Sequence, residues 1–229
     1  MSGMRQLALG VGLHDRATFD SFLPGANREA LAALRALAAG RGETALYLHG
    51  IAGTGKSHLL QAACAAQPGS AYLPLREIAQ LGPGVLEGSA GLPLLAIDDL
   101  ETVAGDARWE QALFTLYNER LGRGARFVVA ATVPARSLVL GLQDLRSRLA
   151  ALAHYALRPL DEAQQREALR ARAQARGLEL PEETQLFLQR HFARDMARLC
   201  ALLDQLDAAS LAEQRRLPVP FIREVLGQP

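Results

Sequence analysis

Short apolar runs alternate with helical repeats over the first two thirds of the chain. The apolar runs predict strands, which lie at 44–50, 70–75, 92–101, 126–134 and 154–159. Around them, apolar residues at helical spacing predict helices at 27–39, 56–67, 109–121 and 141–152. Residues 82–91 are rich in glycine and predict a loop. Alternating strands and helices are typical of a parallel sheet covered by helices, so we expect an α/β core up to about residue 158.

The pattern changes after Pro159. Helical repeats continue to the end of the chain without a run that predicts a strand; they lie at 161–177, 181–192, 195–214 and 220–227. The second of them begins with proline and acids, as helices commonly do. The sequence therefore predicts three segments, which are an N-terminal tail (1–17), an α/β core (18–158) and a small all-helical domain (159–229) joined to the core at a proline hinge.

Composition narrows the class of protein. The chain has 229 residues, a formal net charge of +1 and 49% hydrophobic residues. Proteins that bind nucleic acid by themselves usually carry a basic excess, so we expect no direct specific DNA binding. No apolar stretch approaches the roughly 18 residues of a membrane span, and no secretory signal is visible, so we expect no membrane association and a soluble cytoplasmic protein. The histidines and cysteines form no metal-ligand motif.

The stretch GIAGTGKS follows a predicted strand and opens a predicted helix. Its glycines let backbone N–H groups surround a phosphate without obstruction by Cβ atoms, and the helix N-terminus adds partial positive charge. Lys56 is the only lysine among 25 basic residues, and its compact ammonium suits this turn better than a broad guanidinium. The alternative is a flexible turn before a helix. We expect ADP or ATP to bind through Gly50, Ile51, Ala52, Gly53, Thr54, Gly55, Lys56 and Ser57.

Two acids end the predicted strand at 92–101. A phosphate-binding loop of this kind needs an acid at the end of a buried strand, and Asp98 fits after Leu94, Leu95, Ala96 and Ile97. We expect Ser57 and Asp98 to hold Mg²⁺. Asp99 is a candidate to orient or deprotonate the attacking water. The alternative is that the two acids cap the helix that follows.

Several segments resemble a known family. The order of glycine loop, IDD strand, strand with a polar tip and helical lid resembles the AAA+ ATPases. TFDSFLPGAN (18–27), IDDLETVAGDARWEQALFTLYNERL (97–121), VPARSLVLGLQDLRSRL (133–149) and DQLDAAS (204–210) resemble the Hda family of DnaA homologues, the regulatory inactivators of DnaA. The resemblance implies a P-loop AAA+ core with a helical lid, and we expect no DNA-binding domain like that of DnaA after the lid.

The resemblance also implies partners and further site residues. Hda proteins bind adenine nucleotide, dock on the polymerase sliding clamp and stimulate hydrolysis of ATP bound to DnaA. The N-terminal QLALGV resembles a clamp-binding peptide with Gln6, Leu7, Leu9 and Val11 as its contacts, although an apolar tail packed on its own domain would look the same. Arg148 matches the arginine finger that acts in trans, and the alternative is a solvated helix arginine.

The resemblance assigns two further positions less clearly. Thr132 lies at the place of the polar sensor residue and is a candidate to bind the attacking water or the γ-phosphate, although a threonine at a strand end is common. The family's lid sensor arginine falls on Ala197, between Arg194 and Arg198. The sequence therefore leaves open which arginine senses nucleotide, and whether the chain hydrolyses ATP itself.

The sequence leaves other questions open as well. Phe19 and Phe22 are candidates to line the adenine pocket or to pack in the core. Oligomeric state is open, with a homodimer possible, and so is the choice of ADP or ATP as the active form. The alternative function is a self-contained AAA+ ATPase such as a helicase loader.

Overall fold

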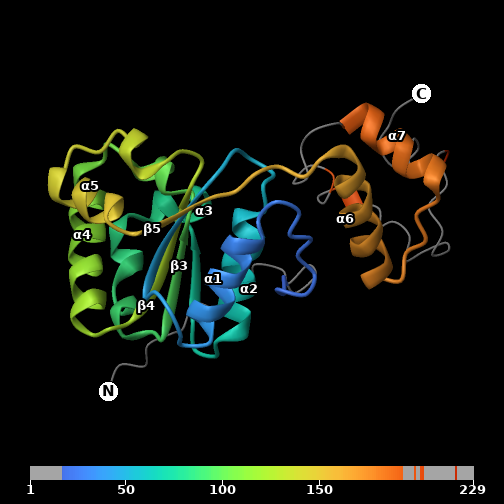
Figure 1. The fold of residues 1–229 in the computed structure, drawn as a ribbon. Coiled ribbons are helices and arrows are strands. Elements are labelled where there is room, and N and C mark those ends of the chain that lie inside the picture. Colours follow the sequence, from blue (N-terminus) through green and yellow to red (C-terminus); the bar gives the residue numbers. More distant parts are fainter. Residues whose placement is uncertain (1–16, 193–198, 200–201, 204–219, 221–229) are drawn as a thin grey trace, which may run out of the picture.

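The computed structural model describes residues 17–192, 199, 202–203 and 220, and its centre is one five-stranded sheet (Figure 1). The strands are β1 (Ala45–His49), β2 (Ala71–Pro74), β3 (Leu94–Asp98), β4 (Arg126–Ala131) and β5 (Ala153–Ala156). All pairs are parallel, in the order β2-β3-β4-β1-β5. The carboxyl ends of all five strands therefore meet at one edge of the sheet.

Helices cover both faces of the sheet. In Figure 1, α1 (Arg28–Ala38) and α2 (Lys56–Ala66) lie on one side, and α4 (Ala107–Gly122) and α5 (Gln143–Ala150) lie on the other. A short helix and five 3₁₀ turns complete the core, namely α3 (Leu75–Ile78), η1 (Ala79–Leu81), η2 (Pro83–Leu86), η3 (Ser89–Gly91), η4 (Leu100–Val103) and η5 (Ala135–Ser137). The expected α/β core is confirmed, and the segment predicted as a loop contains two of these 3₁₀ turns.

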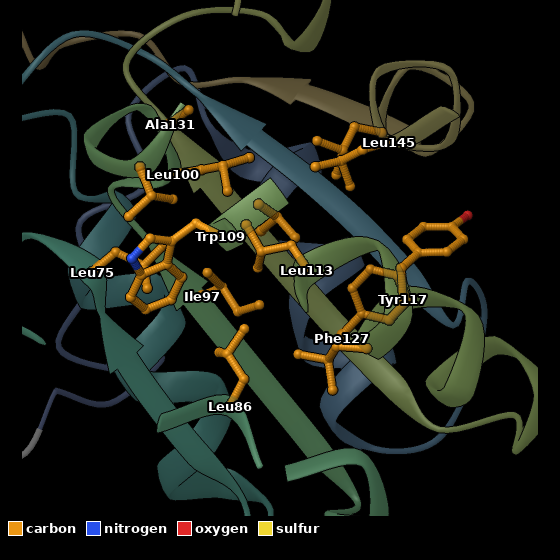
Figure 2. Close-up of a cluster of buried hydrophobic side chains, with 14 of the residues drawn as sticks. Leu75, Leu86, Ile97, Leu100, Trp109, Leu113, Tyr117, Phe127, Ala131 and Leu145 are labelled. Carbon is orange, nitrogen blue, oxygen red and sulfur yellow. The ribbon is translucent and has the colours of Figure 1, made fainter. Parts of the chain in front are cut away.

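Both faces of the central strands are buried, which explains why the strands read as continuous apolar runs. Along β1, Leu46 and Leu48 pack with the cluster under α1 and α2, whereas Ala45 and Tyr47 pack under α4 and α5. Figure 2 shows part of the second cluster, where Trp109, Leu113 and Tyr117 of α4 cover Ile97 and Phe127. Their spacing of four residues places one side of α4 along the sheet.

A buried arginine fixes the irregular segment before β3. Arg120 of α4 is 1% exposed, and its guanidinium donates hydrogen bonds to the carbonyls of Ser89, Ala90, Leu92 and Arg126. Burial lowers the pKa of Arg120 to about 10, which still leaves it charged at neutral pH. One side chain thus joins η3, the chain leading into β3 and the start of β4.

The helical domain begins with α6 (Glu162–Ala175) and α7 (Glu182–Phe192). Asp161 and Gln164 form a capping box at the start of α6. A separate apolar cluster includes Leu169, Leu188 and Leu203, and the helices expected at 195–214 and 220–227 lie largely outside the described residues. The predicted boundaries at residues 17 and 158 stay predictions. Within the described part of the chain, none of the helices combines the length and apolar character that a membrane span needs.

Candidate nucleotide-binding site

The turn between β1 and α2 requires its glycines. Gly53 and Gly55 have φ of 79° and 90°, a backbone conformation that side chains with a Cβ rarely adopt. A Cβ on Gly50 would lie 2.6 Å from the carbonyl oxygen of Leu157, and one on Gly55 would lie 2.7 Å from the ring of Phe22. Gly50, Gly53 and Gly55 are therefore needed for the shape of the turn itself.

Lys56 is the first residue of α2, and its ammonium lies inside this turn. Nζ donates to the carbonyl oxygens of Gly50 at 2.6 Å and Ile51 at 3.1 Å. Burial lowers the pKa of Lys56, while the negative charges of Asp98 and Glu101 oppose that shift. The ammonium is therefore held where the turn would surround a phosphate, on carbonyl partners that it can exchange for phosphate oxygens.

Asp98 ends β3 and is fully buried. One carboxylate oxygen accepts from the Tyr72 hydroxyl at 2.9 Å, and the other accepts from the backbone N–H of Asp99 at 2.9 Å. Tyr72 also hydrogen-bonds Ser57, and burial together with the charge of Asp98 raises the pKa of the Tyr72 phenol. Ser57 and Asp98, which the sequence predicts as the magnesium ligands, therefore both lie near the Tyr72 hydroxyl.

Asp99 follows in a strained backbone conformation. Its φ of 56° places a residue with a Cβ in the left-handed region. Its carboxylate pairs with the Arg76 guanidinium at 3.0 Å, and burial and the charge of Asp98 together raise its pKa. Its proposed part in orienting water stays a prediction, because the contact that Asp99 makes here is with Arg76.

Glu101 is an acid of this site that sequence reasoning missed. Both of its carboxylate oxygens are buried without a hydrogen-bond partner among the described residues. Its negative charge acts on Lys56, Asp99 and Tyr47, which places it close to the phosphate-binding turn. Its position three residues after Asp98 was the available indication, although many surface turns carry a glutamate at such a place.

The lead-in segment packs on the start of α2. The Phe22 ring lies 5.5 Å from the His58 ring, measured between centroids, and His58 Nε2 lies 2.9 Å from the carbonyl oxygen of Thr18. Burial lowers the pKa of His58. The guanidinium of Arg35 lies 5.8 Å from the centre of the Phe19 ring. Phe22 therefore packs beside the loop and Phe19 packs near α1, and a role for either in holding the base stays a prediction.

Thr132 directly follows β4 and is half-buried. Because β4 lies between β3 and β1 in the sheet, Thr132 reaches the same edge as Asp98 and the glycine turn. That is the place expected for a polar sensor residue.

Arg148 lies apart from these residues. It is exposed on α5, which covers the opposite face of the sheet from α2, and its guanidinium carbon lies 6.0 Å from the centre of the Tyr117 ring. An arginine in this place is available to another molecule. The tail residues Gln6, Leu7, Leu9 and Val11 lie outside the described residues, as do Arg194, Ala197 and Arg198 in the lid.

The residues present fit magnesium and nucleotide. The donor set is a serine hydroxyl and a buried carboxylate, oxygen ligands of the kind that Mg²⁺ prefers. The turn offers backbone N–H groups with no Cβ in the way at Gly50, Gly53 and Gly55, and Lys56 supplies positive charge. With the helical lid, the parallel sheet and this site define the chain as a P-loop protein of the AAA+ class.

Two parts of the chain match models of known protein families. Residues 161–226 match the family model described as Hda, lid domain, and residues 13–71 match the bacterial DnaA ATPase domain. Two separate parts of the chain are therefore similar to DnaA-related AAA+ proteins, and the C-terminal part is similar to the lid of Hda.

Solved structures are similar over most of the chain. Domain III of the Thermotoga maritima replication initiation protein DnaA gives a TM-score of 0.75 at 23% identity, over 92% of this chain and 95% of that one. AMPPCP-bound DnaA from Aquifex aeolicus gives 0.67 at 20% identity, over 86% of this chain and 66% of that one. At these identities the likeness supports the fold.

Proposed function

We propose that this chain binds an adenine nucleotide, docks on the polymerase sliding clamp and stimulates hydrolysis of ATP bound to DnaA. The observation that carries the proposal is the match of residues 161–226 to the lid domain of Hda. The exposed place of Arg148 on α5, which covers the other face of the sheet from α2, supports it.

The nucleotide site supplies the first part of the proposal. Backbone N–H groups of the turn and the ammonium of Lys56 bind the phosphates, and Ser57 and Asp98 hold Mg²⁺. When bound, the metal neutralises phosphate charge. The lead-in segment contacts both the turn, where Phe22 lies against Gly55, and the start of the lid. Asn27, at the end of the lead-in, exchanges two hydrogen bonds with Arg158, and Gly25 lies against Leu160 and Gln164.

Arg148 supplies the second part. In the ATP site of DnaA, water attacks the γ-phosphorus, and the bond to the bridging oxygen of ADP breaks. A guanidinium placed beside the γ-phosphate stabilises the negative charge of that transition state, an effect worth about 10³–10⁵ in rate. Arg148 would act in trans on that phosphate, while Lys56 serves the chain's own nucleotide.

The N-terminal tail supplies the third part. Leu7, Leu9 and Val11 would fill an apolar pocket of the clamp, and Gln6 would anchor the peptide by hydrogen bonds. A Gln6→Ala, Leu7→Ala double variant is expected to be lost from clamp-loaded DNA in a pull-down. Full retention of that variant would remove the tail from the mechanism.

The test of the central step is hydrolysis of DnaA-bound ATP in the presence of clamp-loaded DNA. Arg148→Ala is expected to reduce the rate to that of DnaA alone, while its nucleotide affinity by calorimetry stays that of the parent. Arg146→Ala is the matched control, because Arg146 is also exposed on α5, and it is expected to stimulate normally. Normal stimulation by Arg148→Ala would reject the proposed finger.

A second candidate is a self-contained ATPase such as a helicase loader. The observation that favours it is the chain's own set of Lys56, Ser57, Asp98 and Thr132 at one edge of the sheet. Robust turnover of ATP by the purified chain, without clamp or DnaA, would support this candidate. Little solitary turnover together with stimulation of DnaA would support the regulator.

A further inference from the structure

Helix α5 carries Arg148 and is only two turns long, so its direction depends on what holds it. Its neighbour is α4, and the two helices contact each other on the same face of the sheet. Two side chains of α4, seven residues apart, attach to the two ends of the α5 region. These are Glu110 and Tyr117, which lie on one side of α4 because seven residues make about two helical turns.

Glu110 holds the N-terminal end. Its carboxylate is 1% exposed and accepts three backbone N–H groups, from Gly105 at 2.7 Å, Gly141 at 3.1 Å and Leu142 at 2.6 Å. Leu142 is the residue that precedes α5. Gly105 lies shortly after η4, the turn that contains Glu101 of the nucleotide site. One buried carboxylate therefore ties the start of α5 to the segment that leaves the nucleotide site.

Tyr117 holds the other end. Its ring is buried against Phe127 at 5.2 Å between centroids, in an edge-to-face contact, so the ring itself has a fixed place. In Figure 2 its hydroxyl points away from the apolar cluster. The Arg148 guanidinium lies 6.0 Å from the ring centre, within the range of a cation–π contact. A long, exposed side chain thereby gains one preferred direction.

We infer that α4 positions the arginine finger, with Glu110 fixing the start of α5 and Tyr117 fixing the Arg148 guanidinium. This inference rests on the proposed function of Arg148. Glu110 and Tyr117 are positioning residues, because neither reaches the reacting phosphate. Positioning raises the maximal stimulated rate, since a guanidinium that is already directed has less freedom to lose when the transition state forms in the docked complex.

The first test is the contact itself, which does not depend on DnaA. In NMR spectra, the side-chain protons of Arg148 are expected to show an upfield ring-current shift in the parent and in Tyr117→Phe. Tyr117→Leu is expected to abolish that shift. Phe114→Leu, on the same helix, is the matched control and is expected to keep it. A parent protein without the shift would overturn the inference.

The second test is stimulation of hydrolysis by DnaA at increasing concentrations of this chain. Tyr117→Leu is expected to lower the maximal rate by about two- to fivefold, the worth of an exposed cation–π contact, with an unchanged half-saturating concentration. Tyr117→Phe is expected to restore the parent rate. If Tyr117 had only a structural role, the maximal rate would instead follow the stability of each variant, and Phe114→Leu would behave like Tyr117→Leu.

Glu110→Gln tests the other attachment. An amide replaces one acceptor oxygen with a donor, which would face backbone N–H groups. The amide protons of Gly141 and Leu142 are expected to exchange faster with solvent, and the maximal stimulated rate is expected to fall. Parent-like exchange and parent-like stimulation would overturn this part.

The outcomes separate the two proposals. Stimulation that survives Arg148→Ala would overturn the finger and the positioning together, even where the NMR contact is present. An inactive Arg148→Ala beside a fully active Tyr117→Leu would overturn the positioning alone.

Discussion

Two buried cations, carried by helices on opposite faces of the sheet, bind backbone carbonyls, and they differ in how firmly they are held. Lys56 is 6% exposed and donates to two carbonyls of its own turn. Arg120 is 1% exposed and donates to four carbonyls from several segments of the chain. A compact ammonium on a flexible stem can leave two carbonyls for a phosphate, whereas a planar fork with four partners cannot be moved without opening the core.

The comparison shows that a buried cation in this protein can be structural or available to a ligand, and that burial alone does not separate the two. The exposure of the carbonyl groups that each cation binds separates the structural cation from the one available to a ligand. Gly50 and Ile51 belong to a turn that is partly exposed, so water or phosphate can reach them. The partners of Arg120 lie beneath α4, where little else can replace the guanidinium.

The largest expected effect is the loss of the structural cation. Arg120→Leu leaves several buried carbonyls without a donor, so we expect the free energy of unfolding to fall by about 2–4 kcal/mol. The melting temperature would fall by about 4–16 °C, as measured by calorimetry or circular dichroism. Arg123→Leu is the matched control, because Arg123 is exposed at the end of the same helix. An Arg120→Leu protein that melts with the parent would break the comparison.

The second effect is a loss of binding without a loss of stability. Lys56→Ala is expected to weaken ADP and ATP binding by about 10- to 100-fold, the worth of charge-assisted hydrogen bonds to phosphate. The free energy of unfolding should change by less than about 1 kcal/mol, since water can replace the ammonium at the turn. Calorimetric titration and urea denaturation measure the two quantities.

Lys56→Arg sharpens this prediction, because it keeps the charge and changes only the shape. The broad guanidinium is expected to bind nucleotide nearly as weakly as the alanine variant does. Parent-like affinity of Lys56→Arg would contradict the argument that the turn needs a compact ammonium.

The sequence predicted one of these two cations and not the other, for a physical reason. The turn around Lys56 is built from consecutive residues, so its glycines and lysine can be read together from the chain. Arg120 is one of 24 arginines, and its carbonyl partners lie up to 31 residues away. The residues on either side of Arg120 in the sequence do not distinguish it from a solvent-exposed arginine.

The same difference, between contacts of neighbouring residues and contacts of residues far apart in the sequence, decides which other parts of the fold and the site could be predicted. The sheet and most helices were predictable, because apolar periodicity is a local property. Asp98 was predictable from the strand before it. Tyr72, Arg76 and Glu101 were not, because their roles depend on the pairing of β2 with β3 and on the path of the chain after Asp99.

The smallest expected effect concerns Asp99, whose pKa is raised above the ordinary 3.8 by burial and by Asp98. A carboxyl with a raised pKa binds its proton more strongly in the folded chain, so the free energy of unfolding falls as pH rises from about 4 through the folded pKa. Asp99→Asn removes that titration, so urea denaturation between pH 4 and 7 should show a shallower decline than in the parent. Arg76→Ala removes a cation that lowers the pKa of Asp99, so its decline should be steeper. Identical slopes in all three proteins would mean that Asp99 ionises in the folded chain as it does in the unfolded one, and the raised pKa of Asp99 would be rejected.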